Sequence, residues 1–242
     1  VFAQPTYNKH PACGDQCQYI AASYVKYLEM AGARVVPISY FAEEAELDML
    51  FSSLNGFFFP GGSTSFPKSA QYVFDLTLKA NDKGQYSPLW GTCLGFEWIF
   101  MAASHNTSSV DRIIGTDNIS LPLNLLPAAS SSRLLSHAGP LMHTLSTEAI
   151  TFNHHFYGVL FDRWTREPWL RDFFQPLSTN TDSEGQIFVS MMESINYPIY
   201  AVQWHPEKSI FEWGRNPDGS YYQVSRPLHQ STANAPCSSF AR

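Results

Sequence analysis

A single cysteine, Cys93, lies between two glycines in the stretch "GTCLG" at residues 91–95. This form places a nucleophile at a strained turn between a strand and a helix, where larger flanking side chains would collide. The apolar runs "PLW" before it and "FEWIFMAAS" after it fit such a strand and helix. The N-terminus of that helix would lower the pKa of the thiol and hold a thiolate. We therefore predict a catalytic nucleophile, against the alternative of a cysteine that only packs in the core.

The best base for this nucleophile is His205, in the motif "VQWHPE" at residues 202–207. It follows an apolar strand, so it should lie at the same end of a parallel sheet as Cys93. Glu207 comes two residues later, where a turn at Pro206 would direct its carboxylate to the imidazole. These side chains would supply a nucleophile, a base and a group that orients the base. The alternative is a surface loop that carries an unrelated His and Glu.

Backbone amides that could hold an oxyanion are expected in two places. Gly61 and Gly62 follow the apolar run "FFFP", and Leu94 follows the nucleophile. Amides at such positions can stabilise the negative charge of a tetrahedral intermediate. Taken alone, the glycine pair is better explained by a tight turn that needs positive φ.

The remaining histidines and cysteines do not indicate a metal site. His154 and His155, in "FNHHFYG", have no third ligand nearby, so substrate contact or structural hydrogen bonds are expected of them. Cys13 and Cys17 have no second cysteine pair and no histidine at zinc-finger spacing. Four cysteines are also too few for a disulfide framework in a chain this long.

Apolar runs alternate with helical patterns through the first half of the chain. Strands are expected at 1–4, 34–39, 56–60 and 88–93, and helices at 19–33, 43–54, 69–82 and 94–104. Continuously apolar strands that alternate with helices indicate a parallel sheet covered on both faces. Residues 106–147 are rich in loops, and a hairpin that turns near Glu184-Gly185 is expected at 175–193. We predict an α/β three-layer sandwich with a mainly parallel central sheet.

The composition of the 242 residues, 44% hydrophobic and 15% charged, is that of one large domain with a sizeable core. The net charge of −6 and the lack of a basic stripe argue against a nucleic-acid partner. No apolar run approaches roughly 18 residues, so no membrane span is expected. The chain opens in an apolar stretch without a signal peptide, as expected of a processed or truncated form. Residues 1–219 should form the catalytic domain, and the polar residues 220–242 a tail that is disordered or replaces a closing element.

Three motifs stand in the order typical of class I glutamine amidotransferase-like proteins: "FPGGS", "GTCLGFE" and "VQWHPEK". Longer stretches, among them "YIAASYVKYLEMAGARVVPI", "STNTD" and "YPIYAVQWHPEKSIFEW", resemble the γ-glutamyl hydrolase family over about residues 1–219. The resemblance implies an enzyme without a cofactor that removes γ-linked glutamates from folate and antifolate polyglutamates. It implies Cys93 as nucleophile and His205 as base and proton donor. Glu207 would be the partner of His205, and His155 would contact the substrate.

The resemblance also implies a secretory route to the lysosome, the vacuole or the outside of the cell, and homodimers are frequent in the family. The N-x-S/T sequons at Asn106 and Asn118 then become credible glycosylation sites. Two alternatives stay open. In the first, this chain is an unstable, non-catalytic variant, because its polar tail stands where family members continue into an amphipathic helix. A glutamine amidotransferase would use the same three residues to pass ammonia to a synthetase, although the sequence shows no synthetase domain.

Overall fold

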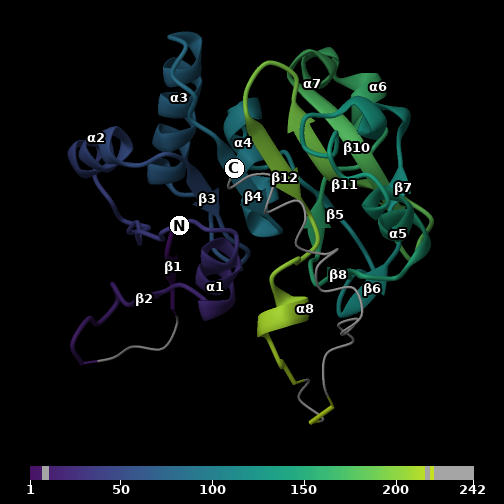
Figure 1. The fold of residues 1–242 in the computed structure, drawn as a ribbon. Coiled ribbons are helices and arrows are strands. Elements are labelled where there is room, and N and C mark those ends of the chain that lie inside the picture. Colours follow the sequence, from purple (N-terminus) through teal and green to yellow (C-terminus); the bar gives the residue numbers. More distant parts are fainter. Residues whose placement is uncertain (7–10, 216–218, 221–242) are drawn as a thin grey trace.

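A computed structural model describes residues 1–6, 11–215 and 219–220 (Figure 1). All but the first residue of the tail expected at 220–242 lies outside the described residues. A six-stranded sheet has the order β3-β4-β12-β11-β10-β7. These strands are β3 (Phe57–Phe59), β4 (Leu89–Thr92), β12 (Ile199–Val202), β11 (Ile187–Ser194), β10 (Phe174–Thr181) and β7 (Asn124–Leu125). The predicted α/β sandwich is confirmed.

The two halves of this sheet differ in strand direction. β3 and β12 both run parallel to β4, with Val202 of β12 opposite Thr92 of β4. β11, β10 and β7 add three antiparallel pairings, and β10 with β11 forms the hairpin predicted at 175–193. The sheet is therefore mixed, and its parallel pairings lie in the strands that lead to Cys93 and His205.

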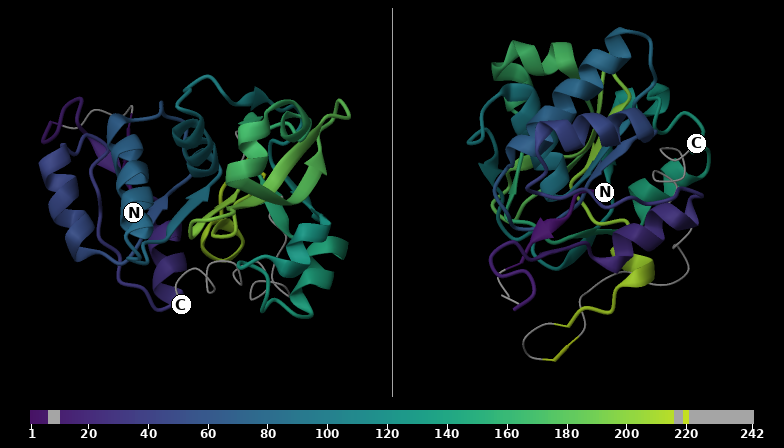
Figure 2. Two further views of the ribbon diagram at one scale, coloured as in Figure 1. Left: turned by 90° about the horizontal axis from the view of Figure 1, so that it is seen from above. Right: turned by 90° about the vertical axis from the view of Figure 1, so that its left-hand side faces the viewer.

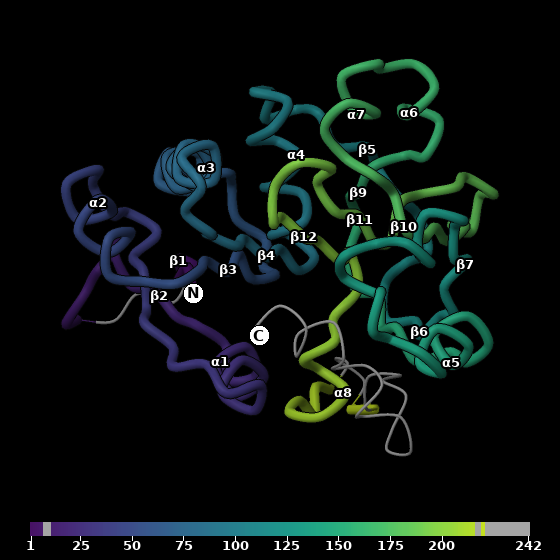
Figure 3. Tube along the Cα trace, turned by 45° about the horizontal axis from the view of Figure 1, so that its top comes forward, coloured from purple at the N-terminus to yellow at the C-terminus, as the bar shows by residue number. Residues whose placement is uncertain are grey.

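Helices cover both faces of the sheet, as Figure 3 shows for the layers above and below the strands. One face carries α2 (Glu44–Ser53), α3 (Lys68–Asp82), α4 (Leu94–Ser104), α6 (Arg163–Arg166) and α7 (Pro168–Phe173). The other carries α1 (Ala22–Met30), α5 (Leu141–Thr147) and α8 (Lys208–Phe211). Figure 2 shows the N-terminal helices (purple to blue) and the β10–β11 hairpin (green) at opposite ends of the molecule. The first four helices are confirmed, with α1 shorter than expected.

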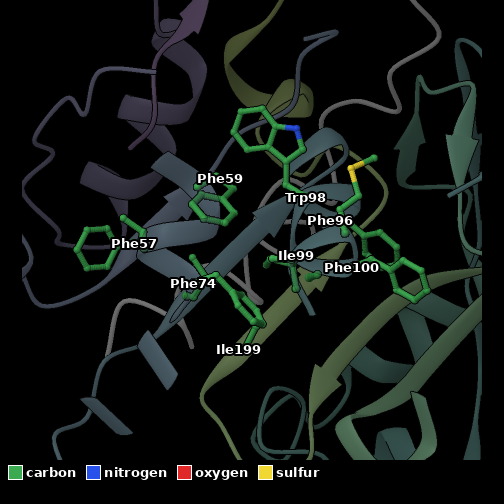
Figure 4. Close-up of a cluster of buried hydrophobic side chains, with 14 of the residues drawn as sticks. Phe57, Phe59, Phe74, Phe96, Trp98, Ile99, Phe100 and Ile199 are labelled. Atoms are coloured by element: carbon green, nitrogen blue, oxygen red, sulfur yellow. The ribbon is translucent and has the colours of Figure 1, made fainter. Parts of the chain in front are cut away.

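Side chains alternate between the two faces along the parallel strands. Phe57 and Phe59 pack into the cluster beneath α2, α3 and α4, whereas Phe58 packs into the cluster beneath α1. Figure 4 shows the first cluster, in which the rings of Phe59 and Trp98 meet edge to face with centroids 5.8 Å apart. A strand buried on both faces needs an apolar side chain at every position, which explains the unbroken "FFF".

The edge of the sheet is less regular than the sequence predicts. Of the strands expected at 1–4 and 34–39, the structure keeps a single parallel bridge between Phe2 and Ile38. The N–H of Phe2 also donates to the carbonyl of Phe58, at 3.1 Å, so this bridge extends the sheet beyond β3.

A disulfide joins Cys13 and Cys17, although the cysteine count predicted no disulfide framework. Two short antiparallel strands, β1 (Gln4–Pro5) and β2 (Gln18–Tyr19), pair on either side of it. The Cα atoms of the two cysteines are 5.0 Å apart, within the usual range for a disulfide. The low number of cysteines argued against a framework of several disulfides. A single disulfide that closes one tight loop needs no second cysteine pair, so the count did not predict it.

Short elements fill the connection between α4 and β10, in agreement with the expected loop-rich region. They are β5 (Asp111–Arg112), β6 (Ile119–Leu121), the 3-10 helix η1 (Pro127–Ser131), β8 (Thr151–Asn153) and β9 (Tyr157–Gly158). β5 pairs with β9 and β6 with β8, each antiparallel. No helix within the described ranges is long and apolar enough to cross a membrane.

Helix α4 packs closely against β3 at Gly95. A Cβ at this position would lie 2.0 Å from the carbonyl oxygen of Phe59, a distance that no pair of non-bonded atoms tolerates. The obstacle is backbone, so a side chain here could be accommodated only if α4 moved away from the sheet. Glycine at residue 95 is therefore a requirement of helix–sheet packing.

Replacing Gly95 by alanine is expected to lower the free energy of unfolding by about 3 kcal/mol, the upper end of typical overpacking costs. Urea unfolding followed by circular dichroism measures the loss. Gly158→Ala is the comparison, because a Cβ there would meet only side-chain atoms, at 3.2 Å or more. An equal loss in the two variants would contradict the backbone clash as the cause.

Candidate active site

Cys93 occupies the turn between β4 and α4 with a φ of 54°, in the left-handed region that non-glycine residues seldom adopt. Its N–H donates to the carbonyl of Val202 on β12 at 2.9 Å, which ties the turn to the neighbouring parallel strand. A Cβ at Gly91 would lie 2.4 Å from the carbonyl oxygen of Gly95. The strained turn predicted for residues 91–95, with its two obligatory glycines, is confirmed.

His205 follows the end of β12 and is 5% exposed. Its Nδ1 lies 2.7 Å from Oε1 of Glu207, a carboxylate that is completely buried. The N–H of His205 donates to the carbonyl of Phe152 at 2.7 Å, which holds the backbone of this turn. A buried carboxylate at Nδ1 favours the tautomer protonated there, so Nε2 is left as the acceptor for a proton.

Cys93 and His205 face a common point beside Gly61. A Cβ on this glycine would lie 3.3 Å from Cβ of Cys93 and 2.7 Å from Cε1 of His205. Both residues line one cleft of about 950 Å³. The structure thus brings Cys93, His205 and Glu207 together at the carboxyl ends of β4 and β12, where crevices form in parallel sheets.

Burial raises the pKa of the Cys93 thiol well above its usual range, and the carboxylates of Glu97 and Glu207 raise it further. The N–H of Leu94 and the charge of Lys208 oppose this shift with smaller effects. The sequence predicted a lowered pKa from the helix N-terminus. The direction is reversed because the thiol of a residue that is only 5% exposed loses more hydration than one backbone amide restores. Cys93 is therefore a neutral thiol that must release its proton when it attacks.

The three amides expected to hold an oxyanion differ in availability. The N–H of Gly61 donates to the hydroxyl of Tyr24 at 2.8 Å, so it is already engaged. The N–H of Leu94 points at the sulfur of Cys93. The N–H of Gly62 makes no hydrogen bond to any residue that the structure describes. Gly62 and Leu94 therefore remain the candidate donors, and Gly61 is not a direct donor in this state.

Tyr24, on α1, is a site residue that sequence reasoning missed. Its hydroxyl accepts the N–H of Gly61 and lies 3.4 Å from Nδ1 of His205. Burial raises its pKa well above the usual value, and the carboxylate of Glu207 adds to the shift. The side chain is therefore a neutral phenol that joins the glycine turn to the imidazole. No local motif signals it, because only packing of α1 brings it to the cleft.

His155 lines the cleft, but the protein already occupies both of its ring nitrogens. Nδ1 lies 2.9 Å from the carbonyl oxygen of Tyr157, and Nε2 lies 3.1 Å from Oδ1 of Asn153. Burial lowers its pKa to about 3, so the ring is neutral. The neighbouring His154 is half-exposed in the same cleft, and its Nδ1 lies 2.6 Å from Oδ1 of Asp117. His154 is therefore the more accessible imidazole of the pair.

Glu97 also lines the cleft, one helical turn after Cys93 on α4. Burial raises its pKa to about 7, and Nε2 of Gln203 donates a long hydrogen bond of 3.4 Å to it. Its carboxylate is thus only partly ionised near neutral pH. The signal for it was present in the sequence, as the last letter of "GTCLGFE".

The asparagines of the two sequons are at least partly exposed. Asn106 is exposed in the loop after α4, and Asn118 is partly exposed with a φ of 58°. Thr107 and Ser108, next to Asn106, line the outer part of the cleft. Over the described ranges of the chain, no three metal-binding side chains are gathered in one place.

Comparisons with known proteins identify the family of this chain. The model of the class-I glutamine amidotransferase family matches residues 11–217. The γ-glutamyl hydrolase of Mus musculus is 42% identical over 221 residues, which cover 88% of this chain and 68% of that protein. The chain belongs to the γ-glutamyl hydrolase family, within the class I glutamine amidotransferases. The predicted family is confirmed.

Other members of the family extend the comparison. The γ-glutamyl hydrolase of Homo sapiens is 41% identical, with 83% of this chain and 64% of that protein covered. γ-Glutamyl hydrolase B of Dictyostelium discoideum is also 41% identical, with 81% and 58% covered. The chain thus spans 58% to 68% of the length of these relatives.

A solved structure from Thermoplasma acidophilum, described as a GMP synthase component, superposes with a TM-score of 0.54. The superposition covers 94% of this chain and 90% of that one, at 15% sequence identity. A likeness at this identity concerns the fold alone, and it agrees with the class I sandwich.

Alkylation of Cys93 by iodoacetamide should be slow at pH 7 and still accelerate above pH 9, because the raised pKa keeps the thiol protonated. A Cys237→Ser background and intact-mass spectrometry separate the signal of this thiol from any reaction at Cys237, which lies outside the described residues. Glu97→Gln should speed the reaction above pH 7, where Glu97 is ionised and opposes the thiolate. A rate that levels off below pH 7 would show that Cys93 is already a thiolate.

Proposed function

We propose that this chain hydrolyses γ-glutamyl amide bonds through an acyl-enzyme on Cys93, with folate and antifolate polyglutamates as its substrates. The observation that carries the proposal is the buried pair of His205 and Glu207 beside a cysteine held at a strained turn. Relatives named γ-glutamyl hydrolase, at 41–42% identity, supply the bond type.

In the first half of the reaction, Sγ of Cys93 attacks the γ-carbonyl carbon while Nε2 of His205 takes the thiol proton. The carboxylate of Glu207 stabilises the imidazolium that results. The carbonyl oxygen becomes an oxyanion that the amides of Gly62 and Leu94 can meet. When the C–N bond breaks, His205 returns the proton to the departing α-amine.

In the second half, water attacks the thioester, and His205 now accepts a proton from the water. The tetrahedral intermediate collapses, the C–S bond breaks, and the proton returns to the sulfur. The raised pKa of Cys93 fits this cycle, because the resting enzyme then holds a neutral thiol whose proton Nε2 of His205 can accept. A cleft of about 950 Å³ lies at the large end of small-molecule sites and suits an extended substrate.

A secretory destination, in the lysosome, in the vacuole or outside the cell, is part of the proposal. The disulfide between Cys13 and Cys17 supports it, because such bonds persist mainly in oxidising compartments. The exposed side chain of Asn106 supports glycosylation at the first sequon, and Asn118 is the second candidate. The homodimer frequent in the family stays a prediction.

Incubation with folate pentaglutamate, followed by chromatography, tests the nucleophile. Wild type should release glutamate or glutamate chains, and Cys93→Ala should release none above the uncatalysed rate. Cys237→Ser is the matched control and should keep the full rate, since the proposed chemistry needs one cysteine. Equal release by wild type and Cys93→Ala would show that Cys93 is not the nucleophile.

A glutamine amidotransferase is the alternative, and the family model at residues 11–217 is the observation that favours it. Free glutamine as substrate separates the two functions. Ammonia release from glutamine without cleavage of the pentaglutamate would decide for the amidotransferase.

Glu207→Gln should reduce kcat by about 100-fold or more, because the amide no longer holds the imidazole in the required tautomer or stabilises its cation. KM should change little, since Glu207 is buried behind His205. Steady-state kinetics on a folate diglutamate measure both. A large rise in KM at constant kcat would assign Glu207 to substrate binding instead.

A further inference from the structure

Lys208 carries the one ammonium or guanidinium group among the described residues that line the cleft. The other ionisable groups of that lining, apart from Cys93 and the tyrosines, are two carboxylates, Glu97 and Glu212, and the three histidines. Polyglutamate substrates are anionic along their whole length. A cleft with a single permanent cation therefore raises the question of what that cation binds.

The position of Lys208 is fixed by two neighbours. Its Nζ donates to Oε2 of Glu212 at 2.5 Å, and Oγ of Ser23 donates to the other oxygen of the same carboxylate at 2.5 Å. Ser23 belongs to α1, which packs beside α8 (Figure 3). The ammonium has three N–H groups, and one of them is used in this contact. Lys208 is thus held in the wall of the cleft with donors to spare.

The charge of Lys208 acts on the reacting sulfur. It lowers the pKa of Cys93, against the larger effects of burial and carboxylates, and Cys93 in turn contributes to the pKa of Lys208. Burial alone would lower the pKa of this lysine, but the carboxylates of Glu207 and Glu212 raise it above its usual value. Lys208 is therefore a cation at any pH at which the enzyme would work, and it lines the same cleft as Cys93.

We propose that Lys208 recognises the α-carboxylate of one of the two glutamates that the scissile γ-amide joins. This inference rests on the proposed function. In a γ-linked chain the backbone runs through side-chain carboxyls, so every residue keeps a free α-carboxylate. Such an anion loses water when it enters a cleft and needs a charge-assisted partner there. Glu212 serves as the counter-ion of Lys208 in the empty cleft and shares it with the substrate.

Binding without turnover tests this role. In a Cys93→Ala background, isothermal calorimetry compares a γ-linked triglutamate with its analogue in which the α-carboxylates are carboxamides. Lys208→Met should weaken binding of the triglutamate by about 10- to 100-fold, the range of one charge-assisted hydrogen bond. It should leave binding of the carboxamide analogue almost unchanged, and Lys208→Arg should restore most of the affinity for the triglutamate.

Lys83→Met is the matched control, since this exposed lysine at the end of α3 removes the same charge outside the cleft. Thermal unfolding verifies that each variant is folded. A folded Lys208→Met protein that binds the triglutamate as tightly as its parent, or that loses affinity equally for both ligands, overturns the proposal.

The same proteins with Cys93 restored separate this inference from the proposed function. If binding depends on Lys208 but the chain cleaves no pentaglutamate, the carboxylate subsite is supported and the proposed hydrolase activity is contradicted. If the chain cleaves the pentaglutamate but binding does not depend on Lys208, the hydrolase activity is supported and the carboxylate subsite is contradicted.

Discussion

The close approach of α4 to the sheet, possible only because residue 95 is glycine, is the constraint on which the rest of the site depends. It brings the first turn of α4 against β3, and the turn that precedes this helix holds Cys93 at a positive φ. The sulfur is thereby placed beyond the end of β4. Since β12 runs parallel to β4, its own end delivers His205 to the same edge of the sheet.

Burial sets the chemistry of the group assembled there. Several polar side chains in and around the cleft have a carboxylate as partner: His205 contacts Glu207, Lys208 contacts Glu212, and His154 contacts Asp117. The groups without such a partner are neutral or shift toward neutrality, as the raised pKa values of Cys93, Tyr24 and Glu97 show. In each case the low polarity of the surroundings raises the free energy of the charged form. Lys208 is the one permanent cation among the described residues that line the empty cleft, and an anionic substrate brings the charge that it is placed to meet.

The walls of the cleft come from separate layers of the sandwich. The sheet and α4 hold the sulfur and the imidazole, whereas α1 contributes Tyr24 from the other face. A fold neighbour with 15% identity shares the sandwich, but the resemblance to γ-glutamyl hydrolases at about 41% identity concerns the side chains. This division explains how one architecture serves several reactions: the sheet positions the nucleophile, and the helices that border the cleft select what reaches it.

The sequence by itself determined the elements and motifs whose causes are local. Strand and helix patterns over "FFFPGG", "PLWGTC" and α4 follow from apolar periodicity, and the glycines around Cys93 follow from steric crowding within five residues. Only the tertiary structure decided that Tyr24 engages the amide of Gly61, and that the expected strand at 34–39 reduces to one bridge. It also reversed the expected pKa shift of Cys93. These outcomes depend on which distant segments exclude water from a given atom, and spacing along the chain does not contain that information.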